Sequence, residues 1–432
     1  MPFFRRLAVV TLALAAGISL AGLPLEAEAA RKKKEEPVAE ENQPDFSKEF
    51  RKQAGPVQKD VIDKKWPEVL VGVAELEKLD GLTHDDKKFI LSWKLQAQQA
   101  TGDRAGLMST LEQFLAGGYA GPELVGPMNQ QLAAWYSEKK DEAKTIDHYR
   151  AYIDATPDVS AGDLAIMGSL YLQSDRLQEG VEWLNRAIAA YEAEGKMPEE
   201  VLFQRLDGAY VTLNDPVGRL NNLEALIKRY PSPEYYSRLL AIYDNSTQDD
   251  RTLMLNAYRL AMVDGGLATV GEHLNYADTA LVLGSPGEAL RAVEKGMSAG
   301  IVPSAGSNQE LLQEAKTAVA RDRRDLPKDS QAAAKDPNGE FEVKVGLGFY
   351  SLGEWEKSVD SVKRGLAKGG VKRQDDANML LGAGLVELGR YDEAKQAFAA
   401  AAAAAGSNDF MRRLAGLWTA YADRKAGGSG AG

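Results

Sequence analysis

The sequence of 432 residues contains no cysteine and only three histidines, and these absences restrict its chemistry. Without cysteine the chain has no thiolate nucleophile, no disulfide and no lipid-modified N-terminal cysteine. His84, His148 and His273 lie far apart, in no spacing that is typical of a metal site. A Gly-x-Ser-x-Gly nucleophile motif is also absent. We therefore expect no enzyme activity, no cofactor and no bound metal ion.

Excess positive charge and strand-forming patterns are lacking as well. The chain has 52 Lys and Arg residues against 63 Asp and Glu residues, which gives a net charge of −11. This acidic balance argues against nucleic acid as a partner. Runs of β-branched residues that alternate with polar ones are absent, so we expect almost no β-strand.

The only long apolar run stands at the N-terminus. Arg5 and Arg6 precede an apolar stretch over residues 7–23, and Ala27-Glu28-Ala29 forms a small-x-small cleavage site. This pattern is typical of a secretory signal peptide over residues 1–30. A retained membrane anchor is the alternative, although the run is short beside the roughly 20 apolar residues of a membrane span. We expect cleavage, a periplasmic location and no integral membrane segment in the mature chain.

Two further segments have compositions that disfavour folding. Residues 31–54 begin with a run of lysines and glutamates and contain few apolar side chains up to Pro44. Such a segment buries too little apolar surface to offset the entropy of ordering. We predict a disordered charged linker over residues 31–54 and a disordered, glycine-rich tail over residues 427–432.

The sequence does contain a motif that occurs twice near its C-terminus. Residues 345–365 and 381–401 each carry Leu-Gly, then an aromatic residue, then a small residue that begins a second apolar stripe. Ser358 and Ala394 hold matching positions 36 residues apart. This is the signature of a tetratricopeptide repeat, a helix-turn-helix unit of roughly 34 residues. We predict an all-α fold, a right-handed superhelical solenoid of tetratricopeptide-like helix-turn-helix repeats.

Fainter copies extend the array upstream. Comparable turns between two helices are recognised near residues 65–67, 101–104, 140–143, 175–177 and 283–286. We predict about ten repeats between residues 55 and 407, the weakest at 300–335, with small residues such as Gly382 where paired helices cross. Residues 408–426 carry one apolar face at helical spacing, which predicts a C-terminal capping helix with Ser407 as its N-cap.

The last two repeats also suggest a binding surface. The first helix of each pair lines the concave face of a tetratricopeptide array. By spacing, Tyr350, Ser351, Val386 and Glu387 lie there at matching positions. We predict that they bind a segment of an envelope protein, with Tyr350 as the anchor, because aromatic residues with a polar tip are enriched among interface hot spots. The alternative for Tyr350 is a core or groove-lining tyrosine.

The sequences of several expected helices resemble those of one protein family. The matching segments cover residues 180–195, 226–231, 292–296 and 366–373. Over about residues 55–424 the chain resembles periplasmic tetratricopeptide proteins associated with TonB systems. The resemblance implies a scaffold that mediates protein–protein interactions beside a TonB–ExbB–ExbD energy-transducing transport complex, and it offers no catalytic residues. The alternative is a scaffold for outer-membrane assembly, or for peptidoglycan synthesis and cell-division coordination.

Overall fold

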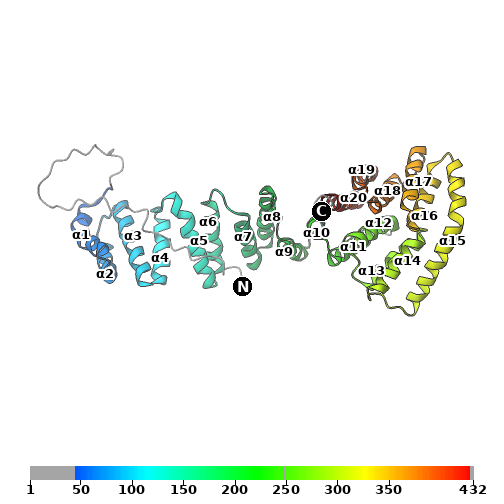
Figure 1. Cartoon of the computed structure of the whole chain (residues 1–432). Helices are drawn as coiled ribbons and strands as arrows, with labels where there is room; N and C mark the ends of the chain where they lie inside the picture. Colours follow the sequence, from blue (N-terminus) through cyan, green and yellow to red (C-terminus); the bar gives the residue numbers. More distant parts are fainter. Residues whose placement is uncertain (1–43, 247–249, 429–432) are drawn as a thin grey trace. The chain divides into compact units, whose positions relative to one another are not determined.

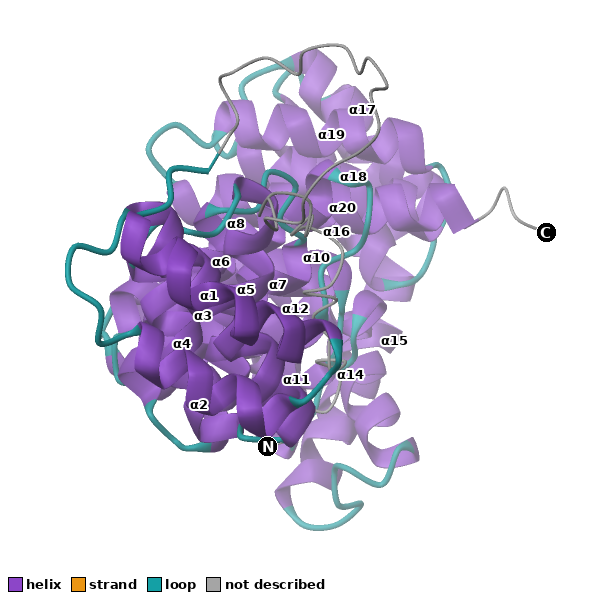
Figure 2. Cartoon of the chain, turned by 90° about the vertical axis from the view of Figure 1, so that its left-hand side faces the viewer, coloured by secondary structure: helices purple, strands orange, loops and turns teal. Residues whose placement is uncertain are grey.

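The computed structural model describes residues 44–246 and 250–428, and within these residues it consists of twenty helices and no strands (Figure 2). The predicted all-α solenoid of helical repeats is confirmed. The predicted signal peptide, the linker up to residue 43 and residues 429–432 of the predicted tail lie outside the described residues. None of the twenty helices is both long enough and apolar enough to cross a membrane.

The chain divides into two compact units after Pro198. The first unit holds eight helices, which can be followed in Figure 1: α1 (Lys48–Ile62), α2 (Trp66–Leu76), α3 (His84–Thr101), α4 (Arg104–Ala116), α5 (Pro122–Glu138), α6 (Glu142–Asp154), α7 (Ala161–Gln173) and α8 (Leu177–Ala193). Each odd-numbered helix packs against the next, which gives four antiparallel pairs. Their apolar side chains form a series of buried clusters along the unit.

The second unit holds twelve helices, and two of them stand outside the pairing. The helices are α9 (Glu200–Thr212), α10 (Pro216–Arg229), α11 (Pro233–Ser246), α12 (Arg251–Asp264), α13 (Val270–Val282), α14 (Pro286–Ser298), α15 (Ser307–Lys335), α16 (Gly339–Ser351), α17 (Trp355–Lys368), α18 (Gln374–Glu387), α19 (Tyr391–Ala404) and α20 (Asp409–Gly428). The helices α15 and α20 are unpaired, and the other ten form five pairs.

The turn inside each pair has one recurring backbone feature. In eight of the nine pairs, the residue two positions before the second helix has a positive φ, between 52° and 77°. These residues are Lys64, Gly102, Lys140, Asp175, Asn214, Gly284, Gly353 and Gly389. The matching residue of the ninth pair lies outside the described residues. The predicted turn positions are therefore confirmed, and the left-handed residue is what closes the first helix before the chain reverses.

Small residues stand where the paired helices cross, as the sequence predicts. A Cβ atom on Gly382 of α18 would lie 2.3 Å from Phe398 Cε1 of α19. One repeat earlier, a Cβ atom on Gly346 of α16 would lie 2.5 Å from Val362 Cγ2 of α17. Since real atoms do not approach so closely, a larger residue at either position would force the facing side chain or the second helix to shift.

The repeat array differs from the prediction at two places. The first helix begins at Lys48, so residues 48–54 of the predicted linker are helical, and Phe50 and Ala54 are fully buried. The weak stretch at 300–335 holds no helix pair but the single 29-residue helix α15, whose length is about 44 Å at 1.5 Å per residue. The described residues thus contain nine helix pairs, against the predicted count of about ten.

The C-terminal helix does more than cap the last pair. Trp418 Nε1 of α20 donates a hydrogen bond to the carbonyl oxygen of Asn256 on α12 at 3.3 Å. Arg413 of α20 forms an ion pair with Glu224 of α10 at 3.1 Å. The last helix of the second unit therefore contacts two of its early helices, and this unit closes on itself.

The boundaries of this helix also differ slightly from the prediction. Asn408 Oδ1 accepts a hydrogen bond from Met411 N at 3.0 Å, so the capping side chain belongs to Asn408 and not to Ser407. The helix continues to Gly428, so residues 427 and 428 of the predicted tail are helical.

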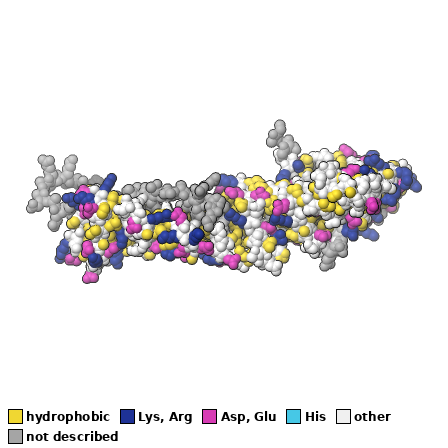
Figure 3. All heavy atoms as spheres, turned by 90° about the horizontal axis from the view of Figure 1, so that it is seen from below, with side chains coloured by type: hydrophobic (Ala, Val, Ile, Leu, Met, Phe, Trp, Pro, Cys, Tyr) yellow, Lys and Arg dark blue, Asp and Glu magenta, His cyan; other side chains and the backbone are white. Residues whose placement is uncertain are grey.

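Surface charge follows the composition. On the face seen in Figure 3, cationic and anionic side chains are interspersed over both units.

Candidate binding pocket in the second unit

The structure separates the four predicted partner-binding residues into three buried ones and one exposed one. Tyr350 and Val386 are only 3% and 7% exposed, and Ser351 is fully buried. Glu387 is exposed. The burial has separate causes: α14 packs against the end of α16 at Ser351, Arg259 of α12 lies over the ring of Tyr350, and α18, which carries Val386, packs against α12 and α20. For Tyr350 the buried alternative is therefore what the structure shows.

Ser351 has a structural role at the contact between α14 and α16. Its hydroxyl accepts a hydrogen bond from Gly287 N at 2.8 Å, and its carbonyl oxygen accepts one from Arg291 Nη1 at 2.7 Å. A Cβ atom on Gly287 would lie 1.9 Å from this carbonyl oxygen, so the approach requires glycine. Ser351 thereby joins two helices that the long helix α15 separates in sequence.

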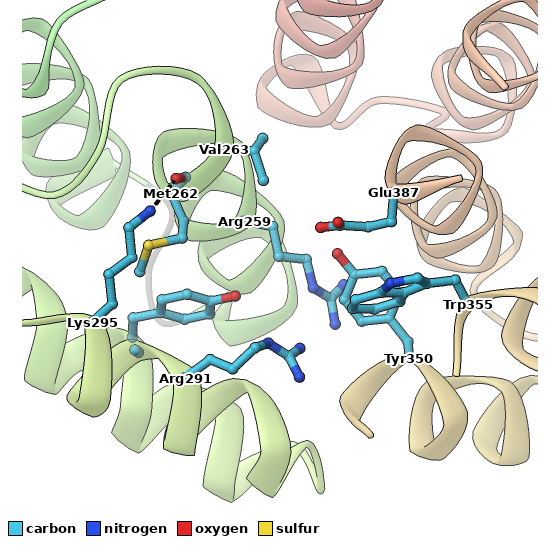
Figure 4. Close-up of a pocket in the computed structure, with 10 residues that line it drawn as sticks. Arg259, Met262, Val263, Arg291, Lys295, Tyr350, Trp355 and Glu387 are labelled. Atoms are coloured by element: carbon cyan, nitrogen blue, oxygen red, sulfur yellow. Dashed lines mark hydrogen bonds between the residues drawn. The ribbon is translucent and has the colours of Figure 1, made fainter. Parts of the chain in front are cut away.

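A pocket of about 380 Å³ opens beside this contact, and two of the predicted residues line it. The pocket is lined by Arg259, Met262, Val263, Tyr276, Arg291, Ala292, Lys295, Tyr350, Trp355 and Glu387. These residues come from the six helices α12, α13, α14, α16, α17 and α18, all in the second unit. Figure 4 shows side chains from opposite walls, such as Arg291 and Glu387, converging on one space. A volume of this size is at the lower end of the range of small-molecule or side-chain sites, about 300–1,000 Å³.

The floor of the pocket is formed by Arg259, whose guanidinium belongs to a buried ion pair with Glu288. Arg259 Nη2 and Nε donate to the two carboxylate oxygens of Glu288 at 2.7 and 2.8 Å. Tyr276 and Ser285 donate further hydrogen bonds to Glu288 at 2.8 and 2.5 Å. Burial alone would raise the pKa of Glu288, but the charge of Arg259 and these hydrogen bonds hold this pKa below its usual value. The floor is therefore a satisfied, neutral pair that has no spare acceptor on the carboxylate for chemistry.

Aromatic rings cover this pair and line the wall. The Arg259 guanidinium lies over the ring of Tyr350, 4.8 Å from its centroid. The rings of Tyr350 and Trp355 meet edge to face, with centroids 4.9 Å apart. The Arg291 guanidinium lies over Trp355 at 5.4 Å. These cation–π contacts fix the ring orientations and leave an apolar surface beside the charged groups.

The rim carries three exposed charges. Lys295 Nζ donates to the carbonyl oxygen of Met262 at 3.0 Å (Figure 4), and the Arg291 contact to Ser351 is also to a carbonyl oxygen. Although Glu387 is exposed as a residue, the walls around its carboxylate partly exclude water and raise its pKa, and Glu288 adds to this, while Arg291 and Lys295 act to lower it. The rim thus offers two cations bonded to neutral carbonyl groups and one partly desolvated carboxylate, an arrangement suited to recognition of a polar partner.

Sequence reasoning located Tyr350 and Glu387 but missed the rest of the lining. Arg259, Tyr276 and Lys295 belong to helices 55 or more residues earlier than Tyr350. The small residues and turn before α14 identified that helix as a second helix. They gave no indication that Arg291 and Lys295 on this helix line a pocket together with residues of α17 and α18.

The histidines form no metal site, as far as the described residues show. Among these residues no group of three or more histidine or acidic side chains could hold a metal ion. His273 is buried, and its Nδ1 lies 2.8 Å from the carbonyl oxygen of Ala292. His148 Nδ1 lies 2.9 Å from Asn129 Oδ1, in the first unit.

Comparison with known proteins adds likenesses to solved structures alone. No protein-family model matches the sequence, and no curated protein matches it either. The chain is similar to the TPR2AB domain of yeast Sti1, solved in complex with pHSP90, at 10% identity and a TM-score of 0.23, over 70% of this chain and 100% of that one.

Two further solved structures are similar to it. A tetratricopeptide repeat protein from Parabacteroides merdae has 12% identity and a TM-score of 0.27, over 68% of this chain and 99% of that one. The TPR domain of P58(IPK) has 12% identity and a TM-score of 0.21, over 88% and 99%. The assignment of this chain as a solenoid of helical repeats therefore rests on its own helix pairs, turns and crossings.

Proposed function

We propose that the chain is a scaffold that binds a segment of a partner protein at the pocket of the second unit. The observation that carries this proposal is the lining of the 380 Å³ pocket, where aromatic side chains lie beside the exposed charges of Arg291, Lys295 and Glu387. Aromatic and arginine side chains are enriched among the residues that dominate binding energy at protein interfaces. The ionisable groups of the floor are all mutually bonded, which favours binding over catalysis.

The finer part of the proposal concerns location and partner. We propose export to the periplasm and an accessory role beside a TonB–ExbB–ExbD complex, with an envelope protein as the partner. The support is the N-terminal sequence pattern over residues 1–30 and the resemblance of the repeats to TonB-associated tetratricopeptide proteins. The experiment is cell fractionation followed by in-cell crosslinking and mass spectrometry. A cytoplasmic protein, or crosslinks only to outer-membrane assembly or peptidoglycan-synthesis proteins, would contradict it.

The pocket itself is tested by charge reversal on its exposed rim. Tyr350 is unsuitable for this purpose, because its truncation would leave a cavity in the core. Glu387→Lys changes an exposed side chain of the rim and should abolish partner capture without lowering the melting temperature. The matched control is Glu356→Lys, which makes the same change on an exposed residue of α17 outside the pocket lining. Equal capture by both variants would exclude this pocket as the docking site.

A further inference from the structure

A second, smaller cavity lies on the other side of Arg259 from the pocket described above. Its volume is about 160 Å³, and α12, α16 and α18 contribute most of its walls. Leu255, Val343, Leu347 and Leu380 make much of this lining apolar. Because Arg259 lines both spaces and is committed to Glu288, it forms a wall between two separate sites.

One carboxylate at this cavity has a bonding partner on only one of its two oxygens. An oxygen of Asp376, on the first turn of α18, pairs with Arg373 Nη2 at 2.8 Å. The other oxygen, Oδ1, is buried and has no hydrogen-bond partner among the described protein atoms. A buried acceptor without a donor is destabilising, so a donor at this position would be stabilising.

Negative charge around Asp376 is also in excess. Arg373 is shared among three carboxylates, at 2.8 Å from Asp376, 3.0 Å from Asp375 and 3.9 Å from Asp250. Burial, with Asp375 and Asp250 adding to it, raises the pKa of Asp376 to about 7, although Arg373 and the more distant Arg259 act to lower it.

The remaining charged groups of the lining do not remove this excess. Lys344 of α16 is exposed. Glu340, on the same helix, accepts a hydrogen bond from Lys372 N at 3.0 Å. Since Arg259 is bonded to Glu288, the Asp376 carboxylate has Arg373 as its one close cation and shares it with two other carboxylates.

We propose that this cavity binds an alkylammonium group, with the aliphatic chain against the leucine and valine side chains and the ammonium paired with the carboxylate of Asp376. A lysine side chain has this chemistry, a four-carbon stem that ends in three donors. At roughly 30 Å³ for each water-sized group, the cavity volume corresponds to about five such groups. The source is a lysine of a partner protein or a free aliphatic amine.

The test uses n-butylammonium as the probe and isothermal titration calorimetry on the full chain. We expect saturable binding of n-butylammonium, and binding of 1-butanol that is weaker by about tenfold or more, because only the ammonium makes a charge-assisted hydrogen bond. Asp376→Asn should weaken n-butylammonium binding by a similar factor. Asp392→Asn, which neutralises an exposed aspartate of α19 outside the cavity, should leave it unchanged.

A second variant and a pH series test the proposal even if the Asp376→Asn protein does not fold. Leu347→Phe should fill the apolar part of the cavity and also weaken binding. Affinity should fall as the pH is lowered through about 7, because protonation of Asp376 removes the acceptor charge. Binding should release protons, which appears as a dependence of the heat on the buffer.

The source of the amine is separated by a blocked lysine, Nα-acetyl-lysine N-methylamide. Binding comparable to that of n-butylammonium would indicate a lysine of a partner protein, and binding of n-butylammonium alone would indicate a free amine. No saturable binding of n-butylammonium, or equally tight binding of 1-butanol, would overturn the proposal. Glu387→Lys should not affect amine binding, so this result is independent of the proposed docking pocket.

Discussion

Adding a single methyl group at Gly382 should destabilise the second unit, although alanine is the better helix former. The new Cβ atom would lie 2.3 Å from Cε1 and 2.6 Å from Cδ1 of Phe398. The Phe398 ring is fully buried and stacks on Trp418, with centroids 5.2 Å apart. Because the ring is held on its other face, the methyl group can be accommodated only if α18 and α19 move apart.

Two effects of opposite sign determine the size of the change. Replacing glycine by alanine inside a helix gains about 1 kcal/mol. Overpacking a filled core costs about 1–3 kcal/mol. Gly208 on α9 provides a matched control in the same unit, since it is exposed and a Cβ atom there would have nothing within 4 Å. The difference in free energy of unfolding between Gly382→Ala and Gly208→Ala therefore isolates the overpacking cost.

The measurement is differential scanning calorimetry of both variants in the full chain. For a unit of this size, 1 kcal/mol corresponds to about 2–4 °C in melting temperature. Gly208→Ala should raise the melting temperature of the second unit, and Gly382→Ala should leave this unit less stable than the Gly208 variant by at least about 2 °C. Equal stabilisation by both substitutions would refute the close crossing of α18 and α19.

Three further changes test the turns and the closing helix. Lys140→Gly should raise the denaturation midpoint of the first unit, because the left-handed conformation costs a non-glycine residue about 1–2 kcal/mol. Trp418→Ala should lower the calorimetric stability of the second unit by about 3–5 kcal/mol. Arg413→Ala should lower urea stability more at neutral than at acid pH. Burial raises the pKa of Glu224, so acid protonates this carboxyl and removes the charge that the variant leaves unpaired.

Local features of the fold could be predicted because each is determined within one repeat. The turn at Gly389 closes with hydrogen bonds from Arg390 N to Leu385 O and from Gly389 N to Val386 O, both at 2.9 Å. All the residues of such a turn lie within a few positions of one another, so a short sequence motif predicts the turn. The same holds for the crossing at Gly382, since its partner Phe398 lies in the next helix.

The long-range contacts left no comparable pattern in the sequence. Arg413 and Glu224 are separated by 189 residues, and neither belongs to a repeat position that the signature defines. The apolar face of α20 predicted a covering role, and it covers α19 as expected. The contact with α12 through Trp418 could not be predicted from residue spacing. A solenoid extends by packing each repeat on its neighbour, and no residue pattern within one repeat indicates that the chain will later contact an earlier repeat.

This closure also explains the mixed outcome for the predicted partner-binding residues. At the 36-residue spacing Tyr350 matches Val386 and Ser351 matches Glu387, but only Tyr350 and Glu387, one residue from each pair, line the pocket. Whether a shared face is surface or core depends on what packs against it, and here α12 covers Tyr350 with Arg259. Glu387 ends its helix beyond that cover and remains exposed. A pocket therefore persists at the edge of the closure, where the last turn of α18 contributes Glu387 to its lining.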